Sequence, residues 1–121
     1  HLFLRTIKEK ENSITSWFAV PIVCENKKIK DEFVNYLEQN FIQTRNYFAG
    51  NYLLHPAYQH LGGFWQYVEA NKVLDQVLFI GCAPSYTQEM LDYICDKICD
   101  YKVRDDINLN LIKKVVHLWI I

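Results

Sequence analysis

The chain has 121 residues and a mass of 14.4 kDa, and 50% of its residues are hydrophobic and 15% aromatic. This length fits one domain, at most with a tail, and the apolar content excludes a mainly disordered chain. The formal charge of -1 argues against a protein that binds nucleic acid through a general basic surface. No apolar run reaches the ~20 residues of a membrane-spanning helix, so we expect neither a nucleic-acid nor a membrane partner.

The two ends of the chain differ in composition from its middle. Residues 1–15 are rich in Lys and Glu and match neither a signal peptide nor a transit peptide, so we expect an extended or frayed lead-in segment in a cytoplasmic protein. Residues 16–101 have the composition of one folded domain. Residues 102–121 end in a short apolar run, which predicts a tail that packs on the domain or on a partner, or that makes the protein prone to aggregation.

The cysteines predict reduced thiols rather than a metal site. No secretory signal is recognised before them, so a reducing compartment is expected. Cys95 and Cys99 stand four residues apart and would share one helix face, which could supply half of a metal site. Structural zinc sites use tighter pairs and four ligands, and the chain has neither CxxC nor HxxxH spacing. We therefore expect no metal site and small, buried, hydrophobic thiols: Cys24, Cys82, Cys95 and Cys99.

The first element of the domain is predicted to be a strand over residues 17–24. This stretch is aromatic and β-branched and is closed by polar residues, which is typical of a central strand that is apolar on both faces. Trp17 and Phe18 are therefore expected in the core. Pro21 has no N–H to donate and argues instead for an edge or a bulge at that point.

A helix is predicted next, over residues 30–40, where apolar side chains recur at helical spacing. Asp31 and Glu32 would lie in its first turn, where the helix dipole favours negative charge, and Asn40 would end it. Weaker elements follow: a short strand at 42–48, a loop in which Gly50 can adopt unusual backbone angles, a turn or short helical piece at 55–58, a flexible break at 62–63, one or two helical turns at 71–76, and an apolar strand at 77–81.

The closing element is predicted to be a helix capped by Thr87, with Glu89 in its first turn. Its acidic stripe at helical spacing predicts a solvated face, although such a stripe could also bind a metal. The element order β-α-β, loop, β-α predicts a two-layer α/β (α+β) domain with its helices on one face of a small sheet. The expected apolar face of the closing helix consists of Met90, Leu91, Ile94, Cys95, Ile98 and Tyr101, and its acidic stripe of Asp92, Asp96 and Asp100.

The stretch from Ile42 to Asn51, followed by Pro56-Ala57-Tyr58, has the most specific pattern. A strand brings Arg45 to the start of a glycine-bearing loop, and a guanidinium can donate two parallel hydrogen bonds to a carboxylate or a phosphate. Glycine lets backbone amides approach a ligand closely. Taken alone, the stretch is also compatible with a surface arginine and an ordinary turn.

These residues resemble the small C-terminal domain of the DegT/DnrJ/EryC1/StrS family of vitamin-B6-dependent sugar aminotransferases. They are most similar to its pyridoxamine-phosphate-dependent 3-dehydratase branch, which acts on nucleotide-linked 4-keto-6-deoxyhexoses such as CDP-4-keto-6-deoxyglucose in lipopolysaccharide biosynthesis. The resemblance covers about residues 16–101 in order and at family spacing. The pieces that carry it are Ser16-Trp17-Phe18, Pro21-Ile22, Gln43-Thr44-Arg45, Phe48-Ala49-Gly50-Asn51, His55-Pro56-Ala57-Tyr58, Phe79-Ile80-Gly81, Pro84 and the helix from Thr87 to Tyr93.

The resemblance implies the small domain of a fold-type-I enzyme and a C-terminal fragment that is not catalytic alone. Pyridoxamine or pyridoxal phosphate would be bound mainly by a large domain that these residues do not include. An iron-sulfur cluster is possible in the intact enzyme, but not in this chain. The implied partners are a nucleotide-linked keto-deoxysugar and a second subunit in a homodimer. The implied substrate-binding residues are Arg45, then Asn51 and Tyr58, with no catalytic residue here.

The sequence departs from the branch at three places and leaves other functions open. Leu54 stands where an arginine is usual, His55 where a glutamine is usual, and Asn71-Lys72 where an Asp-Arg pair is usual. Tyr58 could instead be a packing residue, and Asn51 could hold its own loop through backbone hydrogen bonds. The alternatives are the small domain of a nucleotide-sugar aminotransferase, a non-catalytic α/β dimerisation or interaction module, and, with least support, a regulatory domain that binds a small molecule.

Overall fold

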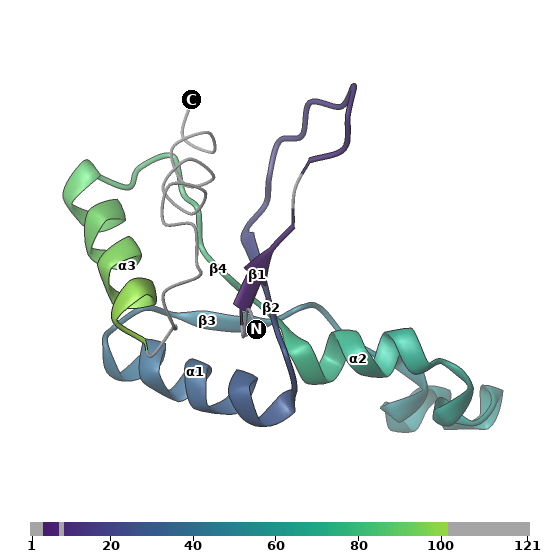
Figure 1. Cartoon of the computed structure of the whole chain (residues 1–121). Helices are drawn as coiled ribbons and strands as arrows, with labels where there is room; N and C mark the ends of the chain where they lie inside the picture. The colour runs from purple at the N-terminus through teal and green to yellow at the C-terminus, as the bar shows by residue number, and fades with distance from the viewer. Residues whose placement is uncertain (1–3, 8, 102–121) are drawn as a thin grey trace.

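A computed structural model describes residues 4–7 and 9–101 (Figure 1). Four strands form one sheet in the order β1-β2-β4-β3, with every neighbouring pair antiparallel. The mixed α/β domain predicted from the sequence is confirmed, and its sheet is antiparallel throughout. The elements are β1 (Leu4–Thr6), β2 (Val20–Cys24), α1 (Lys27–Gln39), β3 (Thr44–Asn46), three short 3₁₀ turns (Tyr52–Leu54, Pro56–Leu61, Phe64–Gln66), α2 (Val68–Gln76), β4 (Val77–Ile80) and α3 (Gln88–Asp100).

The core lies between the sheet and helices α1 and α3. Alternate side chains of a strand point to the same face, so Leu78 and Ile80 of β4 project together toward the helices. Phe33 and Leu37, which are four residues apart, meet them from α1, and both are fully buried. Burial of a side chain of this size stabilises the fold by about 1.5–3 kcal/mol. The remaining buried members of this cluster are Leu4, Val20, Ile22, Cys24, Ile42, Leu91, Cys95 and Ile98.

Strand β2 is central, as its apolar residues predicted, whereas the edge or bulge inferred from Pro21 is wrong. Pro21 lies opposite Phe79 in regular pairing with β4. On its other side, β1 ends at Thr6, opposite Ile22, so the ladder has already stopped beside Pro21. A residue without an N–H is tolerated where one of its two neighbouring strands has ended. Strand β1 itself was not predicted, because three residues of an extended segment carry no periodic signal.

Helix α1 begins at Lys27, three residues before the predicted start, because Asn26 caps it. The Asn26 side-chain oxygen accepts a hydrogen bond from the Ile29 backbone N–H at 3.0 Å. The expected acidic first turn is therefore wrong: Asp31 lies beyond it and pairs with Lys27 at 2.6 Å. The predicted stop at Asn40 is confirmed as the C-cap.

The turn that follows α1 places an aromatic residue in a conformation that favours glycine. Phe41 has φ 59°, and the N–H groups of Phe41 and Ile42 donate to the carbonyl oxygens of Glu38 and Leu37, the Schellman pattern that ends many helices. Outside glycine, this left-handed conformation costs about 1–2 kcal/mol. The Phe41 side chain is 95% exposed, so packing against its own domain does not offset that cost.

Helix α3 begins as predicted. The Thr87 hydroxyl oxygen accepts a hydrogen bond from the Met90 N–H at 3.3 Å, and Glu89 lies in the first turn. Met90 was expected in the core, but it is exposed because its position lies at the edge of the face that Leu91 and Cys95 bury. In the part of the chain that the structure describes, no helix is long and apolar enough to cross a membrane. The predicted tail, 102–121, lies outside the described residues.

The cysteines form no disulfide within the described ranges, and burial separates them into two pairs. Cys24 and Cys95 are buried, whereas Cys82 and Cys99 are half-buried, so the expectation of four buried thiols is met in part. Burial raises the pKa of the Cys24 thiol from 9.0 to about 12, because the thiolate loses its hydration inside the core.

The raised pKa predicts a specific loss of stability at alkaline pH. Between pH 9.0 and about 12 the unfolded chain carries a thiolate at Cys24 while the folded chain keeps the proton. The free energy of unfolding should therefore fall as the pH rises, with a contribution from this group of up to about 1.4 kcal/mol per pH unit. Urea denaturation at several pH values should show a smaller slope for Cys24→Ala than for the wild type. Equal slopes would contradict the assignment.

Replacing Phe41 with Gly should stabilise the chain. Glycine adopts φ 59° without a Cβ clash, so the free energy of unfolding should rise by about 1 kcal/mol. Phe41→Ala is the matched control, since it removes the exposed ring but keeps the strained Cβ and should change stability little. Urea denaturation measures both variants. A loss of stability in Phe41→Gly would show that the ring contributes more than the strain removes.

Candidate functional site

The face of the sheet opposite the helices carries a row of cross-strand neighbours from three strands. Arg45 of β3 lies opposite Phe79 of β4, and Phe79 lies opposite Pro21 of β2. Side chains directly opposite each other on adjacent strands share a face. The pairing of β3 with β4 therefore fixes Arg45 beside the Phe79 ring, on the side of the sheet that α1 and α3 leave open.

Aromatic rings surround Phe79 on this face. Phe18, Phe48 and Tyr47 have ring centroids 5.8, 6.0 and 6.3 Å from that of Phe79, and the rings of Phe18 and Phe48 stack on each other at 6.2 Å. Phe18 was expected in the core, but it is 77% exposed, because the chain reaches the sheet only at Val20. The aromatic character of Trp17 and Phe18 suggested the core, but a run of aromatic residues does not show which of them face solvent.

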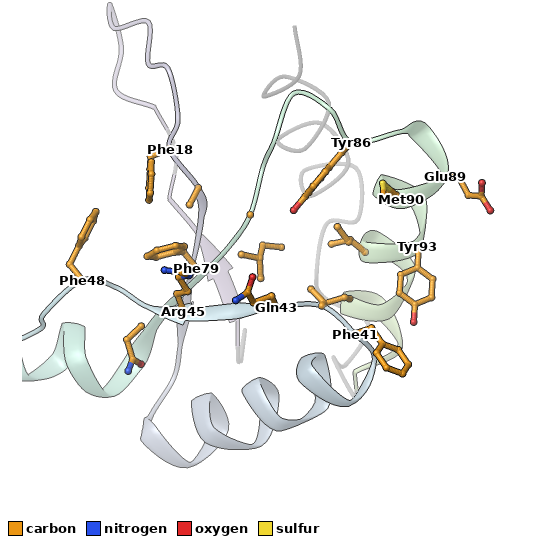
Figure 2. Close-up of a pocket in the computed structure, with 16 residues that line it drawn as sticks. Phe18, Phe41, Gln43, Arg45, Phe48, Phe79, Tyr86, Glu89, Met90 and Tyr93 are labelled. Carbon is orange, nitrogen blue, oxygen red and sulfur yellow. The ribbon is translucent and has the colours of Figure 1, made fainter.

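Phe48 adopts φ 52°, so it is strained in the same way as Phe41, and it too is exposed. These residues lie on either side of β3 and both line one groove (Figure 2). Gly50, two residues further on, has φ 63°, and a Cβ there would lie 2.7 Å from the Leu74 side chain. The unusual backbone angles expected at Gly50 are confirmed, and the loop after β3 can approach α2 only with glycine at this position.

The groove has a volume of about 840 Å³ and runs from the aromatic cluster across β3 to the first turns of α3 (Figure 2). Its lining is mostly aromatic and aliphatic, and its charged members are Arg45 and Glu89. Within the described ranges, the Arg45 guanidinium forms no hydrogen bond and no ion pair. A cation in an apolar groove of this size is a feature of sites that take a small anionic ligand. The lining residues are Phe18, Ala19, Phe41, Ile42, Gln43, Arg45, Asn46, Phe48, Phe79, Ile80, Gly81, Tyr86, Glu89, Met90, Tyr93 and Ile94.

Asn51 does not line the groove; it is 3% exposed and holds its own loop. Its side-chain oxygen accepts a hydrogen bond from the Leu53 N–H at 3.0 Å and caps a 3₁₀ turn. Its amide nitrogen donates to the Phe64 carbonyl at 3.1 Å and to the Asn71 side-chain oxygen at 2.7 Å. Asn71 also donates to the Phe64 carbonyl at 3.1 Å. All of the hydrogen-bonding groups of the Asn51 side chain are thus used inside the domain.

Tyr58 lies apart from the groove lining, in the second 3₁₀ turn. Its exposed ring meets that of Tyr52 edge to face, with centroids 5.5 Å apart. Of the residues expected to bind substrate, the groove therefore includes Arg45 and neither of the other two. Contact of Tyr58 with a substrate stays a prediction from the resemblance.

Lys30 is a buried lysine that the sequence analysis did not identify. Its Nζ donates to the Asn46 side-chain oxygen at 2.8 Å and to the Leu74 carbonyl at 2.6 Å, so it ties α1 to β3 and α2. Burial lowers its pKa, because the ammonium loses hydration. Lys30 stands three and seven residues before Phe33 and Leu37, so helical spacing places it on the buried face of α1, and a lysine at such a position was the signal that could have identified it. The acceptors that it reaches come from distant segments, which spacing along the helix does not indicate.

The described residues do not fit a complete vitamin-B6 site. Lys30 is engaged in the interior, whereas Lys27, Lys28 and Lys72 pair with carboxylates at the surface. No lysine is among the groove-lining residues. Nor does the described part of the chain bring together three or more His, Cys, Asp or Glu side chains that could hold a metal ion. No chemical step through the cofactor can therefore be derived from this chain alone.

The family model of the DegT/DnrJ/EryC1/StrS aminotransferase family matches residues 2–99. The chain belongs to this family. Its members use pyridoxal or pyridoxamine phosphate, and the matched residues include the whole sheet and nearly all of α3. The family assignment made from the motifs around Arg45 is confirmed.

Two curated relatives are 30% identical to this chain. The lipopolysaccharide biosynthesis protein RfbH of Salmonella typhimurium matches over 106 residues, which is 82% of this chain and 24% of the relative. A dTDP-4-dehydro-2,6-dideoxy-D-glucose 3-dehydratase of Saccharopolyspora spinosa matches over 96 residues, which is 74% of this chain and 20% of the relative. The chain thus spans a quarter or less of the length of these family members.

Replacing Asn51 should destabilise the domain. Asn51→Ala removes the hydrogen bonds that the Asn51 amide donates to the Phe64 carbonyl and to the Asn71 side-chain oxygen. The free energy of unfolding should therefore fall by about 2–3 kcal/mol. Asn35→Ala, at an exposed position of α1, is the matched control and should have little effect. Chemical denaturation of both variants measures the difference. Equal stabilities would instead leave Asn51 available for a ligand.

Proposed function

We propose that this chain is the small domain of a nucleotide-sugar 3-dehydratase that acts on a 4-keto-6-deoxyhexose in deoxysugar or lipopolysaccharide biosynthesis. Catalysis would require a cofactor-binding domain outside these residues, and the two relatives have at least three-quarters of their length outside the matched part. The family match and the names of the two relatives support the class of enzyme. The observation that carries the proposal within this chain is Arg45, whose guanidinium lies unpaired, within the described ranges, in an aromatic groove.

Arg45 would bind the diphosphate of the nucleotide sugar or another anion of the reacting complex. A guanidinium can donate parallel hydrogen bonds to two phosphate oxygens, and Arg45 is exposed to solvent, where such a ligand can reach it. The pairing of β3 with β4 fixes the backbone of Arg45. Less conformational entropy is therefore lost when the arginine binds a ligand. Glu89 lines the same groove and would disfavour an anion placed near α3, so the phosphate is expected at the β3 end.

The other residues of the groove would orient the ligand rather than react with it. The vitamin-B6 cofactor, when bound, supplies the electron sink for cleavage of the sugar C3–O bond. This chain contributes a cation, aromatic surfaces on which a base or sugar ring can stack, the amide group of Gln43 and the amide nitrogen of Asn46, whose oxygen accepts from Lys30. Asn51 acts on the site by holding the loop between β3 and α2.

Two other functions remain alternatives to the 3-dehydratase. A nucleotide-sugar aminotransferase of the same family would use the same groove, and its product would keep the 3-hydroxyl and gain an amino group. A non-catalytic interaction module is favoured by the exposed aromatic surface around Tyr58.

Replacing Arg45 tests the proposal in the enzyme that contains this chain together with its cofactor-binding domain. Arg45→Gln should raise the KM for a CDP- or dTDP-linked 4-keto-6-deoxyhexose about 10- to 100-fold, which corresponds to one lost charge-assisted interaction. Arg45→Lys should recover part of the loss, because it restores the charge without the planar fork. Mass spectrometry of the product distinguishes a 3-deoxysugar from an amino sugar.

The matched control for this experiment is Arg5→Gln. Arg5 is an exposed arginine of β1 that lies opposite Val23 and does not line the groove. Its replacement should leave the KM unchanged. A KM that is the same in Arg45→Gln and the wild type would remove Arg45 from the substrate site.

A further inference from the structure

The segment between β3 and α2 contains no charged residue. Residues 51–68 include no Asp, Glu, Lys or Arg, whereas 22% of the whole chain is charged. The segment folds as the three 3₁₀ turns and reaches into the start of α2. Figure 1 shows it at the far end of α2, projecting away from the sheet. We call residues 51–68 the aromatic lobe.

The aromatic lobe has polar groups at its centre and apolar side chains on its surface, the reverse of an ordinary globular unit. Polar groups occupy its centre, where the amides of Asn51 and Asn71 and the Phe64 carbonyl bond to one another. None of the three turns contains a buried residue. The large apolar side chains face outward instead, and those exposed on the lobe are Tyr52, Leu54, Tyr58, Leu61, Phe64, Trp65, Tyr67 and Val68.

Such a surface has the composition of the buried centre of a protein interface. Interface centres are depleted in charged residues and enriched in Tyr, Trp and Phe, and contiguous exposed apolar patches are rare on proteins that act alone. Trp65 and Leu61 are each 67% exposed, so the domain itself covers little of their area. The absence of charge also removes the electrostatic steering that transient partners use. A permanent contact therefore fits the lobe better than a transient one.

We propose that the aromatic lobe docks permanently on the cofactor-binding domain of the same enzyme. The curated relatives contain at least three-quarters of their length outside the matched part, which supplies the surface that the lobe needs. The lobe begins at Asn51, directly after the Phe48–Gly50 loop that adjoins the groove. Docking there would hold the groove of Arg45 against the domain that binds the cofactor. The proposal rests on the proposed function, because it takes this chain to be part of such an enzyme.

The first test compares oxidative footprinting of the lobe in the 121-residue chain alone and in the enzyme that includes the cofactor-binding domain. Trp65 and Tyr58 should be oxidised rapidly in the chain alone and strongly protected in the enzyme. Ile14, which is fully exposed outside the lobe, provides the reference position in both samples. Equal oxidation of Trp65 in the two samples would overturn the proposal.

The second test uses paired substitutions with opposite expectations in the two samples. Leu61→Ser together with Tyr67→Ser should leave the urea midpoint of the chain alone unchanged or slightly higher, because both side chains are exposed there. In the enzyme that includes the cofactor-binding domain, the same pair should lower the urea midpoint, because the two side chains are then buried at the contact. Ile14→Ser is the control and should change neither quantity. An unchanged urea midpoint of the enzyme that carries the pair would contradict the proposal.

The outcomes separate this inference from the proposed function. An enzyme that dehydrates its sugar while Trp65 stays as reactive as in the free chain retains the function and loses the docking site. Protection of Trp65 in an enzyme without activity on nucleotide sugars supports docking and rejects the reaction. Protection that instead grows with the concentration of the chain alone, together with a dimer in sedimentation, would assign the lobe to a second copy and overturn the proposal.

Discussion

The pairing of β4 with both β2 and β3 is the constraint on which the two faces of this domain depend. All four residues of β4 are buried, and the strand has a partner on each side. Leu78 and Ile80 complete the core under the helices, while Phe79 faces the other way and supports the aromatic cluster beside Arg45. A slip of one residue in this register would exchange the two faces, so stability and the candidate site are determined by the same hydrogen-bond ladder.

The domain places its strained and its exposed residues on surfaces that its own core does not use. Phe41 and Phe48 occupy left-handed conformations that favour glycine, and both line the groove with largely exposed side chains. The aromatic lobe adds an apolar surface built around a polar centre. A chain selected only for its own stability would carry glycine at the strained positions and charge on the lobe. Both features are consistent with a domain whose outer surfaces meet other parts of a larger enzyme.

Lys30 and Asn51 stabilise the connection between the core and these surfaces. Lys30 reaches from α1 to Asn46 and to the end of α2, and Asn51 joins the lobe to the start of α2. Neither interaction is a surface ion pair, and each satisfies backbone or amide groups that would otherwise lie unpaired in the interior. The groove therefore has its floor on the paired strands β3 and β4, and hydrogen bonds from Lys30 and Asn51 fix the loop behind it to α2.

The amino-acid sequence by itself determined the family, the principal strands and helices of a mixed α/β domain, and the caps at Asn40 and Thr87; it also singled out Arg45, which the structure places in the groove. These features depend on local patterns: alternation, helical spacing, capping residues and contiguous motifs. Only the tertiary structure decided that Phe18 is exposed, that Pro21 fits a central strand, that Asn51 turns inward and that Lys30 reaches Asn46 and Leu74. Each of these outcomes depends on which distant segment lies beside the residue, and that is information which spacing along the chain does not contain.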